Sequence, residues 1–263
     1  MNVSEISKSL ISIIKEAGKI MLGADSERRF DSKAGTANFV TAYDVAVQNF
    51  LIQKIKELLP EAVFMAEEKE NDKAVLNEKY CFIIDPIDGT TNFIHDYKRS
   101  SISVAMVSNG NTVIGAVYDP YLDELFFAEK GKGAYLNGKA IHVSKNPMEL
   151  SVVLIGSCPY YKEKLADKTF SLTKELFFKT SDFRRSGSAA IDLASIACGR
   201  CDIFFEFQLS PWDFAAGELL VTEAGGMVTK ADGSKTNLEA PCPIFASNGI
   251  MHGELIEMAK KYI

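Results

Sequence analysis

The sequence has little histidine and cysteine, and each shortage narrows the chemistry open to the chain. Its three histidines, His95, His142 and His252, are too scattered to indicate a catalytic triad or a zinc cluster. The five cysteines are an odd number spread through apolar segments, which is typical of reduced thiols in a cytoplasmic protein. Cys198 and Cys201 form a lone CxxC without the second pair of ligands that a zinc site needs, so we predict two core thiols around a helix end.

The chain also lacks an excess of basic residues and any long apolar run. Its 29 basic and 35 acidic residues give a formal net charge of -6, which argues against binding to nucleic acid or to an acidic membrane. The N-terminal residues are amphipathic, carry Glu5 and Glu16, and have no small-residue cleavage site, so they do not resemble a secretion signal. If an anionic protein handles an anionic substrate, bound cations are needed to reverse the charge of its pocket.

The sequence is rich in apolar residues, which make up 47% of the chain. They occur partly at helical spacing and partly in short strand-like runs. Apolar residues at helical spacing predict helices over residues 3–22 and 44–59, followed by short strands over 63–66 and 80–84. From residue 101 to 143, strand-like segments separated by turn dipeptides predict an antiparallel meander.

After about residue 148 the pattern alternates between strands and helices, which is typical of an α/β arrangement. The segments are VVLIGS, a polar helix near 161–178, SAAIDLASIAC, DIFFEF, WDFAAGELLVTEAGG and PIFAS. We therefore predict an α+β subdomain over residues 1–147 and an α/β subdomain over residues 148–263, with a cleft shared between them.

One segment of the meander resembles a phosphate-binding loop. The residues Gly133 to Ala140, GAYLNGKA, nearly match a Walker A loop, but Ala140 stands where a magnesium-binding Ser or Thr is required. Asn137 and Gly138 favour a hairpin turn between strands, so we predict a hairpin here.

Two acidic segments are ambiguous when each is taken alone. In FMAEEKE an apolar strand runs into Glu67 and Glu68, and such a pair is usually solvated surface. In SPWDFAAGELLVTEAGG, Trp212 and Asp213 begin an apolar helix, where an aspartate is also explained by the helix dipole. A ligand role for either segment needs further acidic residues nearby.

A third segment, FIIDPIDGTTNF, is more specific. Asp85 and Asp88 flank a proline, so both carboxylates can face one point with the carbonyl of Ile87 between them. Hard oxygen ligands of this kind suit magnesium better than zinc. Gly89 permits close backbone approach, and Thr90 can start a helix whose free N–H groups hold a phosphate. The alternative, an Asp-Gly turn capped by threonine, does not explain the second acid at the end of an apolar strand.

Taken together and in their order along the chain, with FMAEEKE first, FIIDPIDGTTNF second and SPWDFAAGELLVTEAGG last, the three segments resemble the inositol monophosphatase family. The resemblance runs from about Lys33 to Gly226, and it includes an upstream segment, NFVTAYD, that ends at Asp44. The family string GEE reads AEE here, a mild departure because Ala66 is also small. The resemblance implies a layered αβαβα sandwich of the sugar-phosphatase type and a magnesium-dependent, lithium-sensitive phosphomonoesterase that forms a homodimer.

The resemblance also implies two or three bound magnesium ions. Their ligands would be Glu67, Asp85, Asp88, Asp213 and the carbonyl of Ile87. Charge considerations agree, because clustered carboxylates raise one another's pKa unless cations neutralise them. The chain offers no convincing protein nucleophile, so we expect direct attack by an activated water.

Four residues around this ligand set have roles that the resemblance implies. Thr90 would activate the water with its hydroxyl oriented by Asp44, and Glu67 would lie nearby. The backbone N–H groups of Gly89 and Thr90 would bind the phosphate. Lys33 would balance charge, although a solvated loop lysine is an equal alternative.

For the hydroxyl groups of the substrate, the resemblance points to Ser157, the backbone around Ala189, and Glu206. A strand-end acid facing water is an equal alternative for Glu206. Arg184 and Arg185 either approach a second anionic group or lie at a surface or subunit contact. The expected substrate is myo-inositol 1-phosphate. Alternatives are fructose 1,6-bisphosphate, 3'-phosphoadenosine 5'-phosphate and histidinol phosphate, and a non-catalytic metal-binding interaction protein is an alternative of another class.

Overall fold

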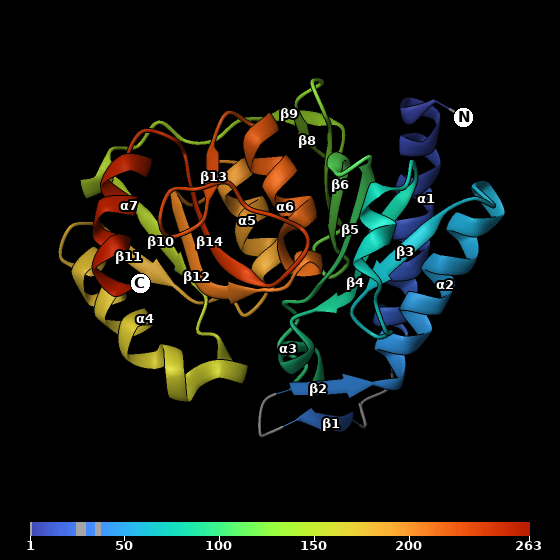
Figure 1. The fold of residues 1–263 in the computed structure, drawn as a ribbon, viewed down its shortest axis with the longest axis horizontal. Coiled ribbons are helices and arrows are strands. Elements are labelled where there is room, and N and C mark those ends of the chain that lie inside the picture. Colours follow the sequence, from blue (N-terminus) through green and yellow to red (C-terminus); the bar gives the residue numbers. More distant parts are fainter. Residues whose placement is uncertain (1, 25–29, 35–37) are drawn as a thin grey trace.

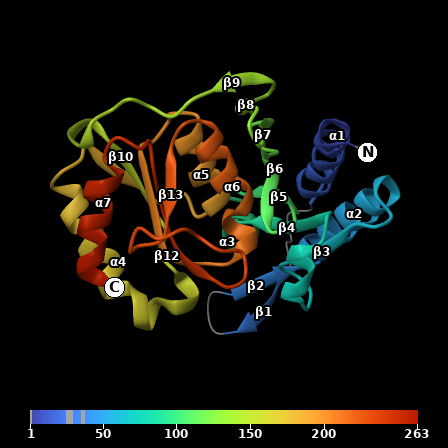
Figure 2. The same ribbon diagram turned by 45° about the horizontal axis from the view of Figure 1, so that its top comes forward.

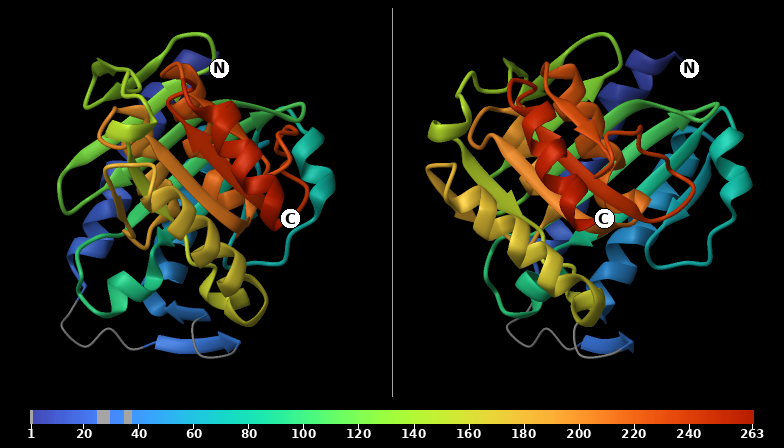
Figure 3. Two further views of the ribbon diagram at one scale, coloured as in Figure 1. Left: turned by 90° about the vertical axis from the view of Figure 1, so that its left-hand side faces the viewer. Right: turned by 60° about the vertical axis from the view of Figure 1, so that its left-hand side comes forward.

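The computed structural model describes residues 2–24, 30–34 and 38–263, which form five layers in the order helix, sheet, helix, sheet, helix (Figure 1). Figure 2 shows one pair of helices between the two sheets, and Figure 3 shows another pair on the outer face of the smaller sheet. The layers confirm the predicted αβαβα sandwich. From one outer layer to the other, the helices are α1 (Val3–Leu22) with α2 (Ala42–Leu58), α5 (Ala189–Ala197) with α6 (Pro211–Glu223), and α4 (Lys162–Phe177) with α7 (His252–Ala259).

The larger sheet has seven strands in chain order, and only its first pair is parallel. Asn109 and Gly110, and again Asn137 and Gly138, have positive φ angles of 49°, 76°, 48° and 78°. Consecutive positive φ values suit tight hairpin turns, so the predicted meander is confirmed and GAYLNGKA is a hairpin. The strands are β3 (Val63–Ala66), β4 (Cys81–Asp88), β5 (Ser101–Ser108), β6 (Asn111–Asp119), β7 (Glu124–Glu129), β8 (Ala134–Leu136) and β9 (Lys139–Ile141).

The smaller sheet is mixed. Its order is β11-β10-β12-β14-β13, in which β10 is parallel to both neighbours and β14 is antiparallel to both of its own. The strands are β10 (Val152–Ile155), β11 (Asp182–Arg184), β12 (Ile203–Leu209), β13 (Met227–Thr229) and β14 (Cys242–Ser247).

Several elements were not expected from the sequence. They are the hairpin β1 (Phe30–Ala34) and β2 (Asn38–Thr41), strands β11 and β13, helix α7, and the short helices η1 (Lys73–Asn77), η2 (Met148–Leu150), η3 (Pro159–Tyr161) and η4 (Lys260–Tyr262). The short helix α3 (Thr90–Ile94) begins at the predicted residue, Thr90. None of the described helices combines the length and apolar composition that crossing a membrane requires.

The central core joins the two halves of the chain. Helix α6, from the second half, packs on the sheet of the first half so closely that a Cβ on Gly115 would lie 2.6 Å from the carbonyl oxygen of Ala216. Glycine is therefore required on β6 at this point. The predicted subdomain boundary at residues 147 and 148 falls between β9 and β10 and stays a prediction.

Candidate active site

The predicted acidic residues come from separate elements and line one cavity of about 250 Å³. Parallel pairing of β3 with β4 places Glu67 beside the end of β4, where its backbone N–H donates to the carbonyl of Ile84 at 3.2 Å. Asp213 reaches the same cavity from the first turn of α6. The predicted residues lining this cavity are Lys33, Glu67, Asp85, Ile87, Asp88, Gly89, Thr90, Glu206 and Asp213.

The segment with the two aspartates, Asp85 and Asp88, is the last part of β4. The strand is irregular at the proline, because its pairing with β5 shifts between Asp85 and Asp88. A bulge leaves extra residues unpaired and re-aims their side chains, and proline is tolerated there. Asp85 Oδ1 accepts a hydrogen bond from the N–H of Ile87 at 3.1 Å, so the segment is held locally.

Two of the acids are oriented by helix N-termini. Asp88 Oδ2 accepts from the hydroxyl of Ser188 at 2.5 Å and from the N–H of Ala190 at 2.7 Å, at the start of α5. Asp213 Oδ2 accepts from the N–H of Ser210 at 2.7 Å, which closes a capping box on α6. Hydrogen bonds of this kind fix the carboxylates with their remaining oxygens free to bind a ligand.

The cavity has a surplus of negative charge. Burial raises the pKa of Glu67 to about 7 and that of Asp88 to about 6. Burial, followed by the charges of neighbouring carboxylates, raises the pKa of Asp85 and Asp213 well above their usual range. Among the described residues lining this cavity, Lys33 is the only cationic side chain. The site therefore favours bound protons or added cations.

Within the described ranges, no three His, Cys, Asp or Glu side chains are already grouped as a closed metal-binding set. The four carboxylates instead face one cavity from three different elements. Carboxylate and carbonyl oxygens are the donors that magnesium prefers. The donor set thus fits magnesium, and the ligand assignment itself stays a prediction.

Thr90 and Asp44 lie together, as the resemblance implied. The Thr90 hydroxyl lies 3.4 Å from Asp44 Oδ1 and donates to the carbonyl of Ile87 at 3.2 Å. Asp44 Oδ2 is held by the N–H and hydroxyl of Thr41 at 2.8 and 2.5 Å. Burial raises the pKa of Asp44, although the bonds from Thr41 lower it. Their catalytic roles stay a prediction.

Lys33 is not a solvated loop lysine. Its ammonium lies 3.1 Å from Glu67 Oε1 and also contacts Glu68. Burial alone would lower the pKa of Lys33, but the charges and hydrogen bonds of Glu67 and Glu68 raise it overall. It is therefore a fixed cation at the cavity rim.

The residues predicted to bind substrate hydroxyl groups line an adjoining cavity of about 90 Å³ that shares Asp88, Gly89, Thr90, Glu206 and Asp213 with the first. It is also lined by Ser157 and Ala189.

Glu206 is buried, with 8% of its surface exposed, so it is not an acid facing water. Burial raises the pKa of Glu206 to about 7, against the hydrogen bond that it accepts from the N–H of Cys158 at 2.8 Å. Gly156 leaves room for this side chain, since a Cβ there would lie 2.0 Å from Glu206 Oε2.

The two arginines separate. Arg185 lines the smaller cavity and donates to the hydroxyl of Ser157 at 3.2 Å. Arg184 pairs with Asp182 on the exposed strand β11 at 2.5 Å. Arg185 is thus placed to meet an anionic group, whereas Arg184 is a surface residue. His95 is exposed at the end of α3 and lines neither cavity.

Three further residues of the site were not singled out from the sequence. Ser188 caps α5 and binds Asp88, and its position before an apolar helix was an available N-cap signal. Asp192 lines the smaller cavity and is a lone acid in an apolar helix, which was also a usable signal. Tyr160 lines both cavities, and nothing in its local sequence indicates this.

Comparison with known proteins is consistent across sequence and structure. The model of the inositol monophosphatase family matches residues 2–263. Nus factor SuhB of Escherichia coli is 41% identical over 202 residues, covering 77% of this chain and 75% of that protein. Inositol monophosphatase 2 of Solanum lycopersicum is 35% identical over 235 residues, covering 88% and 89%.

Solved structures share the fold over nearly the whole chain. The Thermotoga maritima IMPase superimposes with a TM-score of 0.89 at 33% identity, covering 99% of this chain and 98% of that chain. The inositol monophosphate-bound IMPase-II of Staphylococcus aureus has a TM-score of 0.82 at 25% identity, covering 98% and 93%.

Proposed function

Because this chain belongs to the inositol monophosphatase family, we propose that it is a Mg²⁺-dependent phosphatase of small phosphate monoesters and that its substrate is an inositol phosphate. The observation that supports the proposal best is the cavity lined by Glu67, Asp85, Asp88 and Asp213. Four clustered carboxylates, of which Asp85 and Asp88 are buried, with one lysine among them, call for divalent cations and suit a phosphate ester. The bound inositol monophosphate of the S. aureus structure supports the choice of substrate.

The proposed Mg²⁺ ligands are the four carboxylates and the carbonyl of Ile87. Bound magnesium would polarise the phosphate ester, stabilise the leaving alkoxide and lower the pKa of water. Two or three ions per site are proposed, as in the resemblance.

The chain's own groups would bind and orient the reactants. The N–H groups of Gly89 and Thr90 would hold the phosphate, helped by the positive φ of 89° at Gly89. The Thr90 hydroxyl, with Asp44 behind it, would accept and pass on a proton of the attacking water. Glu206 and Ser157 would bind substrate hydroxyl groups in the smaller cavity.

The test is a phosphate-release panel with and without Mg²⁺. It includes myo-inositol 1-phosphate, fructose 1,6-bisphosphate, 3'-phosphoadenosine 5'-phosphate and histidinol phosphate. Fast phosphate release from the inositol ester alone supports the proposal. Rapid turnover of another ester, with inositol phosphate left intact, would identify that ester as the substrate instead. Lithium inhibition, a cytoplasmic location and homodimer formation are further parts of the proposal, the last measurable by sedimentation.

Asp88→Asn tests the ligand assignment, with Asp167→Asn on the exposed surface of α4 as the matched control. The first substitution should abolish Mg²⁺-stimulated hydrolysis while both variants stay folded. Full activity in Asp88→Asn would refute the assignment.

A second candidate comes from the relatives named Nus factor SuhB. That name supports an interaction role in place of, or alongside, hydrolysis. A panel without any phosphate release, combined with intact Mg²⁺ binding, would favour this non-catalytic role.

A further inference from the structure

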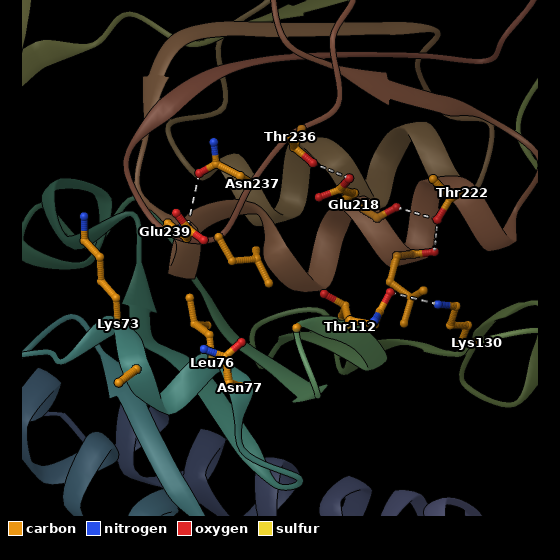
Figure 4. Close-up of a pocket in the computed structure, with 15 residues that line it drawn as sticks. Lys73, Leu76, Asn77, Thr112, Lys130, Glu218, Thr222, Thr236, Asn237 and Glu239 are labelled. Carbon is orange, nitrogen blue, oxygen red and sulfur yellow. Dashed lines mark hydrogen bonds between the residues drawn. The ribbon is translucent and has the colours of Figure 1, made fainter.

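A cavity larger than the two described above lies away from the candidate active site. It measures about 670 Å³, which is within the range of small-molecule sites, and it shares no lining residue with the two cavities above. Its walls are η1, the turn between β5 and β6, helix α6, and the segment 236–239 that precedes β14 (Figure 4).

A half-buried carboxylate, Glu218, faces this cavity, and it forms no ion pair with any residue of the described ranges. Glu218 Oε1 accepts a hydrogen bond from the hydroxyl of Thr236 at 2.6 Å. Burial raises the pKa of Glu218, against that bond from Thr236, and no charged neighbour contributes to the shift. A desolvated carboxylate gains most from a ligand that brings an ammonium group.

Two lysines stand at opposite ends of the cavity, with Glu218 between them (Figure 4). Lys130 has only a long contact of 3.5 Å to Asn111 Oδ1. Lys73 also lines the cavity, at its other end. Glu239 also lines the cavity, so the charges of its two lysines and two glutamates balance, and a ligand that carries one group of each sign is favoured.

Between these charges the lining mixes apolar with polar side chains, among them Asn77, Thr112 and Thr222. Leu76 and Leu219 are 5% and 6% exposed, and Leu238 packs on the same core. Methylene groups of a ligand would be removed from water against these side chains.

We propose that this cavity is a second ligand site for a small zwitterion, which binds Glu218 through its ammonium group and Lys73 or Lys130 through an anionic group. Its carbon chain lies over the three leucines. The site is independent of the proposed hydrolysis, because binding here involves none of the residues assigned to that reaction.

The experiment is calorimetric titration of the full chain with ω-aminocarboxylates of increasing length. Alkylamines and alkanoates of the same lengths each carry only one of the two charged groups, and they serve as half-ligands. Saturating Mg²⁺ is present throughout, so that the acids of the candidate active site do not capture the amines. At least one ω-aminocarboxylate should bind about tenfold more tightly than either half-ligand.

Variants locate the binding. Glu218→Gln should weaken the preferred ligand by about tenfold or more, because it removes the charge at nearly constant shape. Asp167→Asn, on the exposed surface of α4 and outside this cavity, should leave the affinity unchanged. Combined Lys73→Met and Lys130→Met should abolish the advantage over the alkylamine. If Glu218→Gln does not fold, Leu238→Trp supplies a second test, since a large side chain there should block binding.

The proposal is overturned if no probe binds, or if Glu218→Gln and wild type bind equally. It is equally overturned if Asp88→Asn removes the binding, since the probe would then occupy the candidate active site. If the alkylamine and the ω-aminocarboxylate bind with equal affinity, the anionic group contributes nothing to binding and a zwitterionic ligand is ruled out.

Discussion

Single residues decide whether the buried acids of the site point where the chemistry needs them. Glu206 occupies space that exists only because Gly156 has no side chain, and Asp192 is buried with Oδ1 lacking any hydrogen-bond partner in the described structure. Neither the packing of Glu206 against Gly156 nor the burial of Asp192 can be recognised from neighbouring residues in the sequence. Both can be tested by conservative substitutions.

Gly156→Ala is predicted to displace Glu206. The added Cβ would lie 2.0 Å from Glu206 Oε2, so the side chain or the strand must move at a cost of roughly 1–3 kcal/mol. We expect a lower Tm and a raised KM for the phosphate ester, measured by thermal unfolding and steady-state kinetics. Gly253→Ala is the control, because a Cβ there meets nothing within 4 Å and alanine favours a helix. Equal kinetics in the two variants would contradict the predicted role of Glu206.

Asp192→Asn is predicted to stabilise the protein at high pH. Burial raises the pKa of Asp192 well above the unfolded value of 3.8. As the pH rises above that value, the unfolded state releases the proton and the folded state retains it, so stability falls. The variant lacks this loss, and its Tm advantage should be largest near pH ~8 and vanish near pH ~4. Asp167→Asn is the exposed control, and an advantage of constant size across this range would disprove the titration argument.

At the scale of elements, the N-termini of helices position the acids. Helix α2 begins at Ala42, two residues before the predicted start, so Asp44 lies in its first turn and forms a capping box with Thr41. The same bonds that cap the helix therefore orient the carboxylate behind Thr90.

Thr41→Ala is predicted to reduce both stability and kcat. Loss of the cap costs about 1 kcal/mol, and Asp44 loses its hydroxyl donor. Asn2→Ala removes a comparable capping box from α1, far from the site, and should cost similar stability with unchanged kcat. Thr41→Ser should restore both properties. If Thr41→Ala and Asn2→Ala give the same kcat, Asp44 has no part in positioning Thr90.

At the scale of the whole molecule, the site exists where the two sheets approach α6. The acids at the end of β4 come from the first half of the chain, whereas Asp213 and the Ser188 that binds Asp88 come from the second. Folding brings these charges together at an electrostatic cost that cations would offset.

Mg²⁺ is predicted to stabilise the folded chain, more so at high pH. Because the raised pKa values of Glu67 and Asp88, about 7 and about 6, mean that protons compete for the same oxygens, the Tm gain should grow as the pH rises through this range. At a free Mg²⁺ concentration of 100 times the Kd, binding should raise the free energy of unfolding by about 2.7 kcal/mol.

Asp213→Asn should reduce the Mg²⁺-dependent Tm gain, whereas Glu149→Gln on the exposed η2 should leave it intact. A gain that is independent of pH, or equal in both variants, would argue against a magnesium site at these acids. The readout is a thermal scan, so it does not depend on the substrate.

The paired aspartates of DPIDGTTNF were predictable from local sequence, because they end a strand whose apolar pattern is readable. Glu67 and Asp213 were ambiguous in their own segments and were assigned through the resemblance. All four acids line the cavity. Lys33 and Glu206 were ambiguous, since exposure is a property of packing that local sequence does not carry. Tyr160 was missed for the same reason.

The sequence by itself determined the meander, because hydrophobic period and turn residues act over short distances. It also indicated the layered fold and the family, through the resemblance that its acidic segments carry. Only the tertiary structure decided that Arg185 enters the site while Arg184 does not, that Gly156 makes room for Glu206, and that Glu218 faces a separate cavity. These outcomes depend on contacts between residues far apart in the chain. The burial and the electrostatic surroundings of these side chains depend on neighbours in space, which local sequence does not specify.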